Sequence, residues 1–138
     1  MSALTRFLFP APDYRRTPWT LLRWWEARRP LFNLVVGGAG LVTLGVVGVV
    51  TALPPAPLHP FAWGPLARGV VVYGVLANVC YSLGWAAEMG MRTLWREEAP
   101  LAGPALFRQG LSFALGLTLL PIPVVCLGWV VRLVTHLF

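Results

Sequence analysis

Three long apolar stretches without a charged residue organise this sequence, at residues 34–53, 69–87 and 109–131. Each is apolar on every face, so neither the alternation of a half-buried strand nor the one-sided pattern of a surface helix is present. A helix needs about 20 apolar residues to cross the hydrocarbon core of a bilayer, and an open strand has no hydrogen-bond partners there. The pattern therefore predicts an all-α integral membrane protein with three transmembrane helices.

A different pattern precedes the first span. Thr17 followed by Pro18 is typical of a helix N-cap and first helical residue. After these, the apolar residues Leu21, Leu22, Trp24 and Trp25 gather on one side of a helical wheel. We expect an amphipathic helix at about residues 18–29, following the membrane surface.

This helix is expected to act as an interfacial anchor that orients the first span, because indole rings favour the headgroup region and arginines flank the hydrocarbon core. The anchor residues are Trp19, Trp24, Trp25, Arg28 and Arg29. The alternative is a docking surface for a partner protein. The chain thus divides into an N-terminal cytoplasmic or interfacial segment, 1–33, and a three-helix membrane domain, 34–138.

Composition supports this class: 57% of the residues are hydrophobic and 12% are charged, against about 25% charged in an average soluble domain. The net charge is +6, and every basic side chain is an arginine. A strongly basic chain often binds nucleic acid, but these charges flank the apolar spans and do not form one basic face. Nucleic acid is therefore not an expected partner.

The arginines also predict the orientation, because cytoplasmic segments beside transmembrane helices carry an excess of basic residues. Nine of the eleven arginines lie before the first span or between the second and third spans, and only Arg68 and Arg132 lie on the other side. We expect a multi-pass protein of the bacterial inner membrane, with the N-terminus in the cytoplasm and the C-terminus outside.

Chemistry-bearing residues are scarce at bilayer depth, because no span contains an ionisable side chain of Asp, Glu, Lys, Arg or His. Asn78, near the middle of the second span, is expected to make an interhelical hydrogen bond. The alternative is a cofactor-binding role, as a ligand to a lipid, quinone or pigment. Glu88, at the end of that span, is expected to pair with Arg92 one helical turn later, and the alternative is a proton-carrying carboxylate.

No catalytic or metal-binding residues are predicted. Cys80 and Cys126 fall inside spans without metal-type spacing, and His59 with His136 supplies too few ligands for a metal site. The chain is therefore not expected to be an enzyme or to hold a cofactor of its own.

The spacing of small residues is the clearest pattern that indicates helix–helix contact. Gly38, Gly45 and Ala52 are spaced seven apart in the first span, and Gly84 lies seven residues after Ala77 in the second. Small residues at such spacing let membrane helices approach closely. We expect Gly38, Gly45, Ala52 and Gly84 to form a helix-packing interface, part of which meets another chain.

Span three carries Pro121 and Pro123. Proline has no backbone N–H and its ring clashes with the preceding turn of a helix. These two residues are expected to bend the span or loosen its hydrogen bonding.

The run from Asn78 to Trp85 with Glu88, and the pairs Trp24-Trp25 and Arg28-Arg29 ahead of Asn33, resemble stretches in small uncharacterised bacterial membrane proteins. The resemblance implies no particular activity. The pattern as a whole favours a non-catalytic accessory subunit of a larger membrane complex, with a respiratory or photosynthetic complex as the first host by analogy. The expected partners are other membrane subunits and lipids. The alternatives are an oligomeric lipid or solute transporter and a lipid-modifying membrane enzyme.

Overall fold

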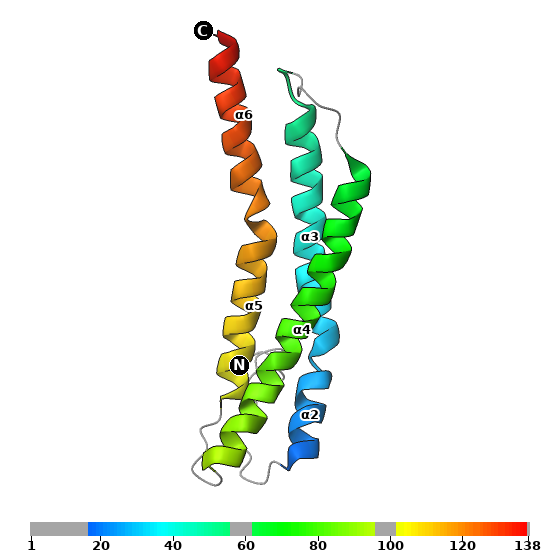
Figure 1. Ribbon diagram of the computed structural model, residues 1–138, viewed down its shortest axis with the longest axis vertical. Helices are drawn as coiled ribbons and strands as arrows, with labels where there is room; N and C mark the ends of the chain where they lie inside the picture. The colour runs from blue at the N-terminus through cyan, green and yellow to red at the C-terminus, as the bar shows by residue number, and fades with distance from the viewer. Residues whose placement is uncertain (1–16, 56–61, 96–101, 138) are drawn as a thin grey trace, which may run out of the picture.

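The computed structural model describes residues 17–55, 62–95 and 102–137, and within these segments every regular element is a helix (Figure 1). The helices are α2 (Pro18–Glu26), α3 (Arg29–Ala52), α4 (Trp63–Trp95), α5 (Gly103–Leu119) and α6 (Pro121–Leu137). Three helical stretches of the described chain are long and apolar enough to cross a membrane: Pro18–Ala52, Gly64–Trp95 and Gly103–Leu137. The prediction of an all-α protein with three such helices is confirmed.

Helix α2 begins as the sequence predicts, because the Thr17 side chain caps it by accepting from the Thr20 backbone N–H at 3.3 Å. It ends at Glu26, short of the expected residue 29. The reason is Pro30, whose ring would clash with the Glu26 carbonyl if the helix continued. The chain makes a turn at Ala27 and Arg28, and α3 then starts with proline in its first turn.

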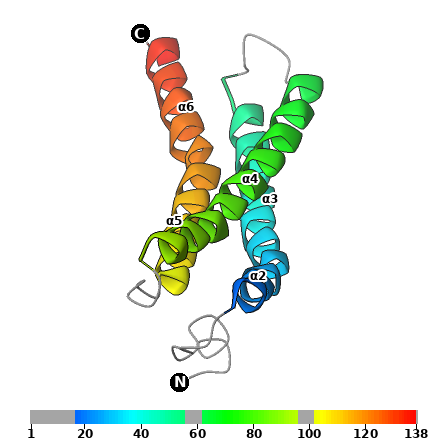
Figure 2. The same cartoon turned by 60° about the horizontal axis from the view of Figure 1, so that its bottom comes forward.

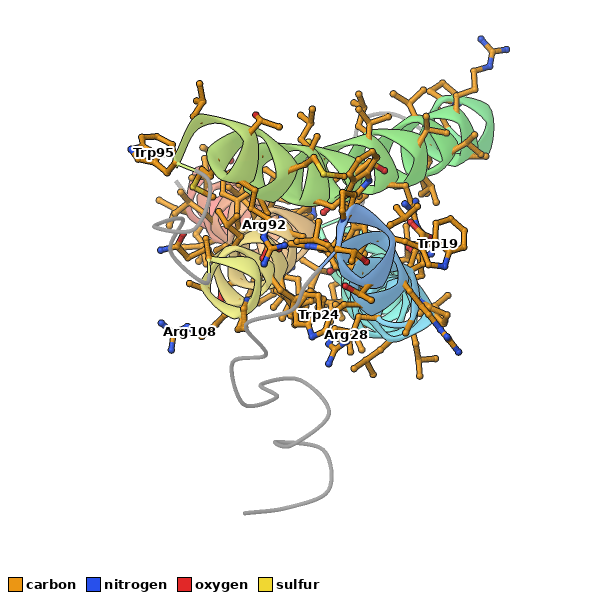
Figure 3. The ribbon with its side chains drawn as sticks, turned by 90° about the horizontal axis from the view of Figure 1, so that it is seen from below. Trp19, Trp24, Arg28, Arg92, Trp95 and Arg108 are labelled. Atoms are coloured by element: carbon orange, nitrogen blue, oxygen red, sulfur yellow. The ribbon has the colours of Figure 1, made fainter. Side chains whose placement is uncertain are left out.

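The direction of α2 differs from the helix expected along the membrane surface. It lies below α3 in Figure 1, and both helices are seen nearly end-on from below in Figure 3, so α2 runs along the bundle and not across its end. Packing explains this direction, because Leu21 and Trp25 are buried in the bundle and α2 lies against α4. Its depth in a membrane stays a prediction.

The third helical stretch is interrupted where the prolines predict. Helix α5 ends at Leu119, Leu120 forms a turn, and α6 starts at Pro121. Pro121 and Pro123 lack the N–H groups that would bond the carbonyls of Leu117 and Leu119. Loss of these bonds allows the change of axis between α5 and α6 in Figure 1.

The helices form an open bundle with its core at one end. Helix α3 lies against α5 and α6, whereas α4 crosses against α5 at the lower end and diverges from α6 above it (Figure 2). The buried apolar residues belong to α2, the first part of α3, the middle of α4 and the first part of α5: Leu21, Trp25, Phe32, Val36, Ala77, Tyr81, Phe107 and Ala114. Helix α6 contributes no buried residue among Pro121–Leu137, so its side chains are left largely uncovered by the rest of the bundle.

The contact of Trp25 with Gly84 yields a prediction about stability. A Cβ built on Gly84 would lie 2.7 Å from Trp25 Cη2, whereas one built on Gly90 in the same helix would meet nothing within 4 Å. Gly84→Ala is therefore expected to lower the free energy of unfolding by about 1–3 kcal/mol, the usual cost of overpacking. The measurement is thermal unfolding in mild detergent, followed by circular dichroism.

Gly90→Ala is the matched control, and it is expected to be neutral or stabilising by up to about 1 kcal/mol, because alanine favours the helix. Equal melting temperatures for the two variants would contradict the close Trp25–Gly84 contact.

Candidate functional site

A buried cluster around Trp25 joins four helices at the lower end of the bundle. Trp25 is 2% exposed, and its indole Nε1–H donates to Glu88 Oε2 at 2.8 Å. Its backbone carbonyl accepts a hydrogen bond from the Tyr81 hydroxyl. The same indole lies over Gly84, where only hydrogen leaves room for it. One side chain of α2 thus makes both polar and apolar contacts with α4.

Aromatic rings complete the cluster from the neighbouring helices. Trp25 and Tyr81 meet edge to face, with ring centroids 5.3 Å apart and planes at 80°. Phe107 of α5 meets both of them at 6.2 Å, and Phe32 of α3 lies 4.8 Å from Tyr81. Each such pair contributes about 0.5–1.5 kcal/mol beyond the burial of its area. The cluster therefore fixes α2, α3, α4 and α5 relative to one another.

Glu88 is the buried carboxylate of this cluster, with 1% of its surface exposed. A Cβ built on Gly103, the first residue of α5, would lie 2.6 Å from Glu88 Oε2. Glycine at that position lets the start of α5 close over the carboxylate, and the positive end of a helix dipole favours a negative charge there. Pairing of Glu88 with Arg92 stays a prediction, and Figure 3 shows the Arg92 side chain directed inward between α2, α4 and α5.

The five predicted anchor residues lie at this same end but in different surroundings. Trp19 is 72% exposed and points away from the bundle (Figure 3). Arg28 is 5% exposed, donates from Nη1 to the Trp24 carbonyl at 2.8 Å, and places its guanidinium carbon 3.8 Å from the centre of the Trp24 ring. Trp25 is enclosed by protein. The closest contacts of Trp25 and Arg28 are therefore with the chain itself.

Arg29 has a mixed environment. Its guanidinium makes two hydrogen bonds to the Glu26 carboxylate, at 2.9 and 2.7 Å, and a third to Ser82 Oγ at 3.1 Å. The side chain remains 28% exposed, so Arg29 links α3 to α4 while part of it stays accessible.

A second polar group joins the three long helical stretches higher in the bundle. Thr43 of α3 donates to the Thr118 carbonyl at 2.9 Å. The Tyr73 hydroxyl of α4 lies 2.6 Å from Thr118 Oγ1 and 2.9 Å from the Ala114 carbonyl. Hydroxyl groups in lipid need such partners, since each unsatisfied group costs several kcal/mol. These contacts satisfy Thr43, Tyr73 and Thr118 within the chain.

Asn78 makes the interhelical hydrogen bond that its position predicts. Its Nδ2 donates to Asn33 Oδ1 on α3 at 3.0 Å and to the Gly74 carbonyl of its own helix at 3.0 Å. The sequence pattern alone does not identify Asn33 as the partner. The spacing is a signal that could have found it: Asn33 lies one helical turn after Arg29 and therefore falls on the same face of α3.

A lateral groove of about 590 Å³ lies between α3 and α4 above this amide pair, and Leu117, Thr118 and Pro121 of α5 and α6 also line it. Apolar side chains and glycines line most of it, with Asn33 and Asn78 at its lower end and Tyr73 and Thr43 along its wall. Its volume lies in the range of small-molecule sites, roughly 300–1,000 Å³.

The predicted packing residues fall into two groups. Gly84 receives the Trp25 indole, whereas a Cβ built on Gly38 or Gly45 would meet nothing within 4 Å. Ala52 is exposed as well. Within the described segments, Gly84 is thus the glycine of this set that lies close against another helix, and contact of Gly38, Gly45 and Ala52 with another chain stays a prediction.

Metal chemistry was not expected from the sequence. Among residues 17–55, 62–95 and 102–137, the His, Cys, Asp and Glu side chains do not gather in groups of three that could hold a metal ion. His59 lies outside these segments. Cys80 and Cys126 are free thiols on α4 and α6.

The Trp25–Glu88 hydrogen bond yields a second stability prediction. Trp25→Phe keeps an aromatic ring in the cluster but removes the Nε1–H donor from a buried carboxylate, together with the outer indole carbons that lie over Gly84. Loss of a buried partner costs about 1–3 kcal/mol, so the free energy of unfolding is expected to fall by that amount in a detergent titration. Trp19→Phe, at a 72% exposed position, is expected to change it by less than about 0.5 kcal/mol. Equal effects of the two substitutions would contradict the bond.

Searches with the chain against family models, curated proteins and solved structures find no match. Its function is therefore inferred from the contacts, burial and charge of its own residues.

Proposed function

We propose that this protein is a non-catalytic accessory subunit of a larger membrane protein complex and acts by packing its helices against other subunits. The observation that carries the proposal is the open glycine face of α3. A Cβ built on Gly38, Gly45 or Gly48 would meet nothing within 4 Å.

The energetics of glycine support this proposal. Helix α3 contains five glycines in 24 residues, and each glycine in a helix interior is less favourable than alanine by about 0.5–1 kcal/mol. Four of them gain no compensating close contact within the chain. Close approach of a second helix supplies that compensation, because small residues maximise packing between membrane helices.

The polar groups support it in a different way. The Thr43, Tyr73, Thr118 and Asn78 side chains hydrogen-bond within the chain, so the outer faces of the spans are left mainly apolar. Only 11% of the residues in each apolar window are buried. Lipids and neighbouring subunits therefore have to cover the remainder.

The proposed setting is the bacterial inner membrane, with the N-terminus in the cytoplasm. Within the described segments, Arg23, Arg28, Arg29, Arg92 and Arg108 belong to the lower end of the bundle, and Arg68 with Arg132 to the upper part. This asymmetry supports a cytoplasmic lower end. By analogy, a respiratory or photosynthetic complex remains the first host to test.

Reporter fusions check the orientation. Alkaline phosphatase fused after the C-terminal residue is expected to be active, because the C-terminus is external, whereas green fluorescent protein at that position is expected to be dark. The same reporters fused after Trp95 are expected to give the opposite pair of results. A fluorescent, phosphatase-negative C-terminal fusion contradicts the orientation.

Co-purification tests the subunit role. A tagged full-length chain extracted in mild detergent is expected to run with a large complex on native gels, with its partners in stoichiometric amounts by mass spectrometry. Gly45→Leu is expected to lower partner recovery by about tenfold or more, since overpacking a close contact costs about 1–3 kcal/mol.

Gly128→Leu on α6 is the matched control. It introduces the same side chain where a Cβ also meets nothing within 4 Å, but on a helix with one glycine. It is expected to leave recovery unchanged. Isolation of the wild-type chain only as a monomer would remove the proposed function.

A further inference from the structure

The seam between α3 and α4 changes in polarity from its lower end upward. Arg29 meets Ser82 at 3.1 Å, and one helical turn higher Asn33 meets Asn78 at 3.0 Å. One turn above these, the corresponding residues are Gly37 and Gly74, where a Cβ would meet nothing within 4 Å. The order along the seam is thus cationic, then amide, then apolar.

Two surface depressions join along this seam. A shallow one is lined by Arg29, Ser82, Asn78 and Gly74, among others, and the deeper apolar groove between α3 and α4 shares Asn78 and Gly74 with it. The deeper groove follows α3 from Asn33 to Val47, which is about 21 Å at the helical rise of 1.5 Å per residue. This length exceeds one leaflet of the hydrocarbon core, about 15 Å.

We propose that this seam is a binding site for one anionic glycerophospholipid. Its phosphate lies beside Arg29, its ester groups beside the Asn33–Asn78 pair, and one acyl chain in the groove past Gly37 and Gly74. From headgroup to acyl chain, such a lipid is first charged, then polar and then apolar. The seam shows the same order from its lower end upward.

The hydrogen-bonding groups match this ligand. The contact between the two amides uses Asn78 Nδ2 and Asn33 Oδ1, so the Asn33 Nδ2 donor is available to an ester carbonyl. Within the described segments Arg29 donates from Nε and Nη2 to Glu26 and Ser82, which leaves its Nη1 donor for a phosphate oxygen. A guanidinium suits phosphate because of its planar set of donors.

Charge favours an anionic headgroup over a zwitterionic one. Arg29 is the charged residue in the lining of the two depressions, and its acidic partner Glu26 lies outside that lining. The glycine face at Gly45 does not line the groove. The lipid site therefore does not depend on the proposed subunit role.

Native mass spectrometry of the purified full-length chain tests the site, with added dioleoylphosphatidylglycerol and, separately, dioleoylphosphatidylcholine. The wild-type chain is expected to retain one phosphatidylglycerol in preference to phosphatidylcholine. Gly74→Leu fills the groove, and it is expected to weaken phosphatidylglycerol retention by about tenfold through overpacking. Gly37→Leu is a second filling variant from the opposite wall, with the same expectation.

Two control variants separate this site from other causes. Gly45→Leu, outside the groove, is expected to retain the lipid as the wild type does. Arg29→Gln is expected to reduce the preference for phosphatidylglycerol by about fivefold, whereas Arg23→Gln, which removes the same charge from an exposed position, is expected to leave it nearly unchanged.

Several results would overturn the proposal. Unchanged lipid retention in both groove-filling variants rules out the groove, and equal headgroup preference in Arg29→Gln and Arg23→Gln rules out Arg29 as the phosphate ligand. A photo-crosslinking residue at position 74 that captures a polypeptide in intact membranes, and no lipid, assigns the seam to a protein partner. These outcomes test the lipid site alone, whereas loss of co-purification in Gly45→Leu tests the proposed subunit role.

Discussion

The packing of Trp25 against α4 is the interaction on which the lower bundle depends. Its indole lies over Gly84, donates to Glu88 and meets the rings of Tyr81 and Phe107. These contacts hold α2 along the bundle, and the Glu88 carboxylate in turn brings Gly103 and the start of α5 into place. Burial of a carboxylate is costly without hydrogen bonds, so the donor and the carboxylate stabilise each other.

The upper bundle is organised by a different constraint, the need to satisfy polar groups where water is absent. Thr43, Tyr73 and Thr118 connect the three long helical stretches through hydroxyl and carbonyl groups. They lie just before the break at Leu120, so the polar contacts and the change of axis occur at the same level. Above the break α4 diverges from α6 (Figure 2), and α6 contributes no buried residue there.

Two surfaces of α3 therefore have different properties. The face with Gly38 and Gly45 consists of small residues outside the groove, which suits another helix. The seam with α4 carries Arg29, Asn33 and Asn78 before it becomes apolar, which suits an amphipathic lipid. In the two proposals, α3 thus offers Gly38 and Gly45 to another helix, and Asn33 and Gly37 to a lipid.

The sequence by itself determined the fold class and the approximate spans, because hydrophobic length and proline chemistry are local properties. It also indicated the break at Pro121 and an interhelical bond for Asn78. It did not identify Asn33 as the partner, the burial of Trp25 and Arg28, or the course of α2 along the bundle. Only the tertiary structure decided these, because Trp25 and Glu88 are 63 residues apart, and no local pattern shows which distant side chain accepts a hydrogen bond or which glycine leaves room for an indole.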